Sequence, residues 1–168
     1  VIEAQLARGG PEATSLRFAT IYAPGKGGRH GGASTLSRLV AAGITGEPFM
    51  LERGGDQVDD VIWVGDAADG VVRAAAAAGP LAELYNISSG TGIRIADFAA
   101  RVRELYPHAR LQIEGGLHYM GPEPTYGVLD PARARRDLGL VIDPDPSRGI
   151  RLFAAALRGD GGGGRGRA

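Results

Sequence analysis

A short run of aromatic and β-branched residues that breaks at Pro-Gly constrains the fold of this chain most. The run, Leu16–Tyr22, is partly apolar on both of its faces, and Pro24-Gly25 and a glycine-rich, basic loop follow it. Such a pattern is typical of a parallel strand that is covered on both sides. In open parallel sheets, loops at the carboxyl ends of strands hold ligands. The sequence therefore predicts a parallel sheet in which this strand carries a binding loop.

The other patterns along the chain alternate between helix and strand, which indicates an α/β fold. Gly43 is expected to end the first helix, and Asp66 to cap the second. Residues 1–8 are predicted to be the last turns of a further helix. Helices are predicted over 34–42, 67–78, 95–106, 131–138 and 147–157, and strands over 48–52, 58–64, 84–88 and 111–114.

Composition excludes several classes of function. Lys+Arg and Asp+Glu both number 19, so no basic field for nucleic acid is present. No apolar run reaches membrane-spanning length, and the chain has no cysteine for disulfides, thiol catalysis or thiolate metal sites. These features predict a cytoplasmic protein. Residues 1–158 are expected to form the folded part, and the glycine-rich segment 159–168 to be disordered.

Four segments together resemble the extended short-chain dehydrogenase/reductase family, the NAD-dependent epimerases and dehydratases. Leu16–Pro24 resembles the family's L-R-x-x-N-V-Y-G-P, and 57–68 resembles R-D-F-x-Y-V-x-D-V-A. Residues 84–92 resemble Y-N-I-G-S-G, and 129–139 resemble D-x-x-K-A-R-R-E-L-G. The resemblance implies the C-terminal part of a Rossmann-type parallel sheet with a small α/β substrate-binding lobe, and NAD or NADP as cofactor.

The same resemblance implies site residues around the first segment. Thr20 stands where the family usually has an asparagine that contacts substrate, and Ala19 where a residue lies against the nicotinamide. Tyr22, Pro24 and Gly25 would shape the wall, with Tyr22 and Pro24 on the cofactor side and Gly25 on the substrate side. Two simpler interpretations stay open: Thr20 satisfies the sheet edge, and Tyr22 belongs to the core.

Two positions that face substrate in the family carry unusual residues here. Asp59 stands where members that act on nucleotide-diphosphate sugars carry an arginine for the pyrophosphate, and Met120 matches a second family arginine. A guanidinium suits two charged oxygens, whereas Asp59 and its neighbour Asp60 would repel them. A UDP- or dTDP-sugar substrate is therefore disfavoured, unless Arg53 or Arg29 substitutes.

The family's nucleotide-binding and catalytic motifs are not found. No strand is followed by the glycine fingerprint, and the Gly90-Thr91-Gly92 turn is better explained as structural. Tyr22 and Lys26 spell Tyr-x-x-x-Lys, but Pro24-Gly25 prevents the helix that would place both side chains on one face. We therefore assign no catalytic residue in this chain, and expect the true pair a few residues before Val1.

Other chemistries have less support. The three histidines lack metal-ligand spacing, and Trp63 is expected in the core.

Two hypotheses follow. In the first, the chain is the substrate-binding half of an NAD(P)-dependent epimerase, dehydratase or reductase. Its substrate would be a hydroxy or carbonyl compound, and sugar derivatives are among the compounds that this includes. It would act as a homodimer or together with a nucleotide-binding half. In the second, it is a non-catalytic binding module that lacks the dinucleotide site.

Overall fold

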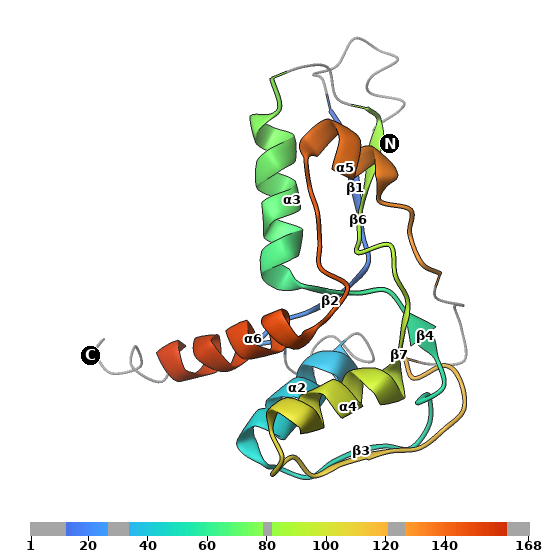
Figure 1. Cartoon of the computed structure of the whole chain (residues 1–168), viewed down its shortest axis with the longest axis vertical. Helices are drawn as coiled ribbons and strands as arrows, with labels where there is room; N and C mark the ends of the chain where they lie inside the picture. The colour runs from blue at the N-terminus through green and yellow to red at the C-terminus, as the bar shows by residue number, and fades with distance from the viewer. Residues whose placement is uncertain (1–12, 27–33, 79–81, 121–126, 161–168) are drawn as a thin grey trace, which may run out of the picture.

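The helices and strands of this protein form two groups, and one extended segment of the chain runs from the first group to the second. The computed structural model describes residues 13–26, 34–78, 82–120 and 127–160. Figure 1 shows β1 (Ser15–Phe18), β6 (Leu84–Ile87), α3 (Val64–Ala76) and α5 (Ala132–Leu138) together at one end. At the other end lie α2 (Thr35–Thr45), α4 (Ile95–Leu105) and β3 (Phe49–Leu51), and β2 (Thr20–Tyr22) runs between the two groups.

The strand changes partners between Ala19 and Thr20. β1 pairs in parallel with β6, and β2 pairs in parallel with β5 (Val61–Trp63). The Ala19 N–H donates to the Ile87 carbonyl at 3.0 Å, and the Thr20 N–H donates to the Asp60 carbonyl at 2.8 Å. Successive backbone groups of a strand point to opposite flanks, so β6 and β5 lie on opposite sides of it. Among the described residues, no strand pairs with the flank of β1 that faces away from β6.

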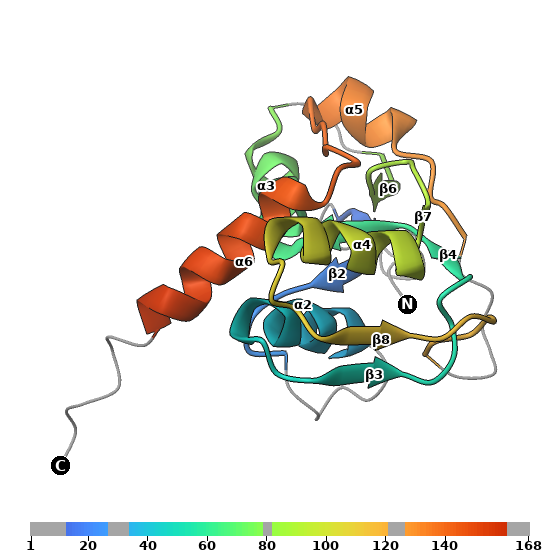
Figure 2. The ribbon, with the colours of Figure 1, turned by 60° about the horizontal axis from the view of Figure 1, so that its bottom comes forward.

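The smaller group of elements is built on a second parallel pair. Figure 2 shows β3 beside β8 (Leu111–Ile113), and Phe49 is in register with Leu111. Helices α2 and α4 pack on this pair and on each other. β4 (Val58–Asp59) and β7 (Ile93–Arg94) add a short antiparallel connection between the two groups. These parallel pairs and their covering helices confirm the predicted fold, part of a Rossmann-type sheet with a small α/β lobe.

Two apolar clusters of buried side chains form the core of the protein. The larger one surrounds Tyr22, whose ring lies 5.6 Å from that of Trp63 and 5.4 Å from that of Phe98. It contains Leu36, Leu39, Val40, Ile95, Val102, Ile150 and Phe153. The smaller one lies between β5, β6, α3 and α5, and contains Ile62, Ala67, Ala74, Tyr85, Ile87, Ala134, Leu138 and Leu140. Trp63 is therefore a core residue, as predicted.

Helix α6 (Ser147–Asp160) joins the larger cluster through Ile150 and Phe153. Its first turn approaches β2 and β5 so closely that a Cβ on Gly149 would clash with the Tyr22 hydroxyl. That hydroxyl donates to the Pro146 carbonyl at 3.2 Å. Helix, strand and aromatic ring thus fit together without room for a side chain at this position.

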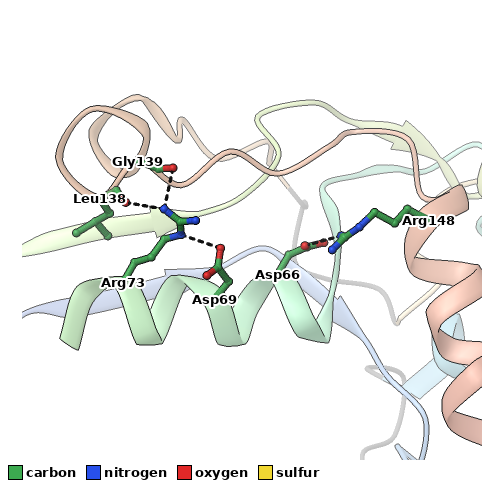
Figure 3. Close-up of polar contacts among 6 residues, drawn as sticks. All are labelled: Asp66, Asp69, Arg73, Leu138, Gly139 and Arg148. Carbon is green, nitrogen blue, oxygen red and sulfur yellow. Dashed lines mark hydrogen bonds and ion pairs between the residues drawn. The ribbon is translucent and has the colours of Figure 1, made fainter. Parts of the chain in front are cut away.

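Polar contacts link α3 to the two C-terminal helices (Figure 3). The Arg73 guanidinium donates to the Leu138 and Gly139 carbonyls at 3.3 and 3.1 Å, and pairs with Asp69 at 2.7 Å. Because Leu138 and Gly139 end α5, these bonds satisfy carbonyls that the helix itself leaves free. At the other end of α3, Asp66 pairs with Arg148 of α6 at 2.9 Å.

Two helix boundaries for which the sequence suggested a specific residue differ from the prediction. Helix α2 continues through Gly43 to Thr45 and is capped by Gly46, whose φ is +77°. Gly43 is needed inside the helix because a Cβ there would clash with Val102 of α4. Helix α3 begins at Val64, so Asp66 lies in its first turn and is not its cap. A carboxylate in the first turn still favours the helix through the macrodipole.

The two ends of the chain are described only in part. Helix α6 continues through Gly159 and Asp160, two residues into the segment for which disorder is expected. Residues 161–168 and the helix predicted over residues 1–8 lie outside the described residues. Among the described helices, none is both long and apolar enough to span a membrane.

Candidate functional site

A pocket of about 130 Å³ opens at the point where the strand changes partners. Arg17, Phe18, Ala19 and Thr20 form one wall, from the end of β1 into β2. Asp59 and Asp60, which precede β5, form a second wall. Gly127 and Leu129 complete the lining. The structure therefore brings together three residues predicted for the site, Ala19, Thr20 and Asp59.

Asp60 organises the pocket from inside the protein. Its side chain is fully buried and accepts hydrogen bonds from the Ser88 and Ser89 hydroxyls, the latter at 3.1 Å. The Leu129 N–H donates to the same carboxylate at 3.2 Å. One side chain thus ties the start of β5 to the end of β6 and to the pocket segment at Leu129. Both serines directly follow β6. They therefore lie at the carboxyl end of a parallel strand, where open parallel sheets bind their ligands.

Asp59 is the second buried carboxylate, with 2 % of its surface exposed. The Tyr119 hydroxyl donates to Oδ2 at 2.6 Å, and the Asp60 N–H donates to Oδ1 at 2.8 Å. The Thr20 side chain also lowers the pKa of this carboxyl. Burial raises the pKa of Asp59 above its usual value, against the lowering effect of these hydrogen bonds. Thr20 lines the pocket together with this buried acid, in addition to pairing with Val61 in the sheet.

The raised pKa of Asp59 makes a pH dependence of stability measurable. The folded protein holds the Asp59 proton more tightly than the unfolded chain, so this contribution is fully present below the carboxyl's ordinary pKa of about 3.9. It is lost as pH rises through the raised pKa of the folded state. Urea unfolding from about pH 3.5 to about pH 7 should therefore show Asp59→Asn gaining stability relative to wild type as pH rises.

Asp56 supplies a matched comparison with the opposite sign. The Gly116 N–H bond and the Arg94 guanidinium lower the pKa of Asp56, so its contribution is lost as pH falls. Asp56→Asn should therefore lose stability relative to wild type as pH rises. The same slope for both variants would contradict the assignment of a raised pKa to Asp59.

The remaining predicted site residues lie outside the pocket lining. Tyr22 is 1 % exposed and belongs to the larger cluster, which agrees with its interpretation as core. Pro24 and Gly25 form a turn after β2, with Gly25 exposed at a φ of +74°. Met120 packs against the larger cluster, next to Tyr119. The roles predicted for these four residues toward cofactor and substrate stay predictions.

Two residues that sequence reasoning missed complete the site. Tyr119 reaches Asp59 from 60 residues away, and no local pattern marks that contact. Ser88 had a signal in the sequence, because it stands directly after a buried strand. Its contact with Asp60 nevertheless depends on the order of the strands, which the local sequence does not reveal.

Tyr22 and Lys26 do not lie on a helix, and both of their polar groups bind backbone carbonyls. The Tyr22 hydroxyl is bonded to Pro146, whereas Lys26 Nζ donates to the Ile21 carbonyl at 3.0 Å. A turn at Pro24-Gly25 separates the two residues. Among the described residues, no group of three or more His, Asp or Glu side chains could hold a metal ion.

The turn at Gly90 and Gly92 does not fit the pyrophosphate of a dinucleotide. A phosphate loop needs glycines whose missing side chains leave room for the ligand. A Cβ on Gly90 would lie 2.8 Å from Pro131, and a Cβ on Gly92 would lie 2.5 Å from Val58. The turn before α4 is thus filled by the protein's own side chains, as the sequence indicated.

Comparison with known proteins identifies the family to which this chain belongs. The model of the NAD-dependent epimerase/dehydratase family matches residues 1–88, just over half of the chain. This chain belongs to that family. The match includes both walls of the pocket, from Arg17 to Asp60, and ends at Ser88. No curated protein sequence matches this family member significantly.

Solved structures of epimerases and dehydratases share its fold. UDP-glucose 4-epimerase from Thermus thermophilus, in complex with NAD, superposes with a TM-score of 0.73 at 22% identity, covering 94% of this chain and 50% of that one. The NAD-dependent NDP-hexosamine 5,6-dehydratase TunA, of tunicamycin biosynthesis, gives 0.67 at 25%, covering 88% and 46%. The Bordetella bronchiseptica enzyme WbmF, in complex with NADH, gives 0.66 at 27%, covering 89% and 46%. The chain thus spans about half the length of these structures.

Proposed function

We propose that this chain is the substrate-side half of an NAD-dependent sugar-modifying enzyme of the epimerase/dehydratase family. The observation that carries the proposal is the open flank of β1 beside the pocket at Thr20 and Asp59. A neighbouring strand from a nucleotide-binding half would pair there and continue the Rossmann sheet. It would also close the pocket next to the bound dinucleotide.

The chain's own residues have defined tasks in this proposal. Thr20 and Asp59 contact a hydroxy or carbonyl substrate, and Ala19 lies toward the nicotinamide. The dinucleotide accepts or donates a hydride when it is bound by the other half. Gly25 and Met120 extend the substrate side, and Tyr22 and Pro24 support the cofactor side through the turn after β2.

The surroundings of β1 explain why a partner is expected. Phe18, at the end of β1, is 36 % exposed, and the backbone groups on its open flank have no strand partner among the described residues. Exposed strand edges pair readily with other chains. The partner is therefore a nucleotide-binding half, on the same polypeptide or on another, or a second copy of the protein. The chain has no cysteine, in keeping with a reducing, cytoplasmic location.

NADH binding tests the proposal directly. Trp63 fluorescence is followed during titration with NADH, for the 168-residue chain and for the product of the whole reading frame that encodes it. We expect no saturable quenching with the chain alone, and saturable quenching with the longer product. A longer product that does not bind NADH would favour the non-catalytic binding module. Saturable binding by the chain alone would contradict the division into halves.

A further inference from the structure

The charge balance of the pocket is unusual for a site that would bind a diphosphate. Two of the lining residues are Asp59 and Asp60, whose side chains are buried. Among the described residues, the single cation in the lining is Arg17, which is exposed. A phosphate group beside Asp59 would therefore meet a like charge in a setting where water screens it poorly.

Among the described residues, the donors that bind Asp59 are neutral. The Tyr119 hydroxyl and the Asp60 N–H each donate one hydrogen bond, and no cation in the described part of the chain forms an ion pair with Asp59. A carboxylate offers about four acceptor positions, so these two bonds leave acceptor capacity for a ligand. An acceptor in a pocket wall recognises a hydroxyl or ammonium donor and rejects a phosphate oxygen.

Arg53 does not reverse this balance. It was a candidate to replace the missing pyrophosphate ligand, but its Nε donates to the Leu117 carbonyl at 2.8 Å. Arg53 is exposed and does not line the pocket. In the described part of the chain, exposed Arg17 is therefore the one guanidinium that lines the pocket.

From these observations we propose that Asp59 selects a phosphate-free substrate, a hydroxylated or amino sugar that donates a hydrogen bond to its carboxylate. The proposal rests on the proposed function, in which this pocket is the substrate site. It departs from the UDP-sugars named for several structures of the same fold. Asp59 acts as a specificity-determining residue, and Asp60 holds the wall in which it stands.

The test compares glucosamine with UDP-glucose as probes. Binding of each is measured by ligand-detected NMR, in the presence of NADH, on the product of the whole reading frame. We expect glucosamine to bind wild type more tightly than UDP-glucose does. Asp59→Asn should weaken glucosamine binding by about tenfold, the effect of losing a hydrogen bond to a charged group, and should improve UDP-glucose binding.

Two further variants distinguish the effect of the Asp59 charge from a general effect on folding. Asp69→Asn removes an exposed carboxylate of α3 and should leave the preference unchanged. Tyr119→Phe keeps the Asp59 charge and frees one acceptor position, so it should retain the preference for glucosamine; this variant decides the question if Asp59→Asn does not fold. Tighter wild-type binding of UDP-glucose than of glucosamine, or an unchanged ratio in Asp59→Asn, would overturn the inference. Normal NADH binding in that same experiment would leave the proposed function standing.

Discussion

Replacing Asp60 by alanine is expected to lower the free energy of unfolding by about 3 kcal/mol, because buried donors lose a charged acceptor. The Ser88 and Ser89 hydroxyls and the Leu129 N–H all donate to this carboxylate. Without it, the side-chain link between the start of β5 and the end of β6 is lost. Urea unfolding monitored by circular dichroism measures the effect.

The matched control for Asp60 is an acid on the surface. Asp69→Ala removes a carboxylate that pairs with Arg73 while both side chains are nearly half exposed. Such a pair contributes at most about 1 kcal/mol. Asp60→Asn keeps the shape and one acceptor oxygen, so its stability should lie between those of wild type and Asp60→Ala. Equal stabilities of Asp60→Ala and Asp69→Ala would refute the central role of Asp60.

Gly149→Ala is expected to destabilise the protein by about 3 kcal/mol, the upper range for overpacking a dense core. A Cβ at this position would clash with the Tyr22 hydroxyl and lie 2.8 Å from Trp63 Cβ. The helix cannot move away freely, because Ile150 and Phe153 anchor it in the larger cluster. Thermal unfolding followed by Trp63 fluorescence reports the change next to the altered residue.

Gly159 provides the control on the same helix. A Cβ there meets nothing within 4 Å, so Gly159→Ala should be neutral or stabilise α6 by up to about 1 kcal/mol through helix propensity. The double variant Gly149→Ala/Tyr22→Phe should recover part of the loss, because the clashing hydroxyl is gone. If both glycine variants unfold at the wild-type temperature, the close approach of α6 to β2 is wrong.

Local sequence predicted most elements because their patterns are strong. The apolar spacing of Ile95, Phe98 and Val102 marks α4, and all three residues are fully buried. The prediction that Gly43 ends its helix was wrong. Glycine often ends a helix, but Gly43 lies inside α2, where α4 packs closely against it. Nothing in the neighbouring residues shows that Val102 of α4 takes the space that a side chain would need.

The candidate site was only partly predictable for the same reason. Thr20 and Asp59 could be proposed because the family motifs place them, and the structure brings them into one pocket. Tyr119 could not, because its contact with Asp59 joins segments 60 residues apart. The sequence also suggested a general conflict between Asp59 and phosphate, but the set of neutral partners around that carboxylate appears only in three dimensions.

The sequence by itself determined the α/β class, the family and the order of the helices and strands, since these depend on local periodicity and on short motifs. The tertiary structure alone decided three other features: which flank of β1 has no partner strand among the described residues, the burial of two adjacent acidic residues at a pocket, and the fit of Gly149 against Tyr22. Each of them arises where segments far apart in the sequence come into contact. The free energy of burying a charge or filling a space depends on those contacts, and not on the neighbouring residues along the chain.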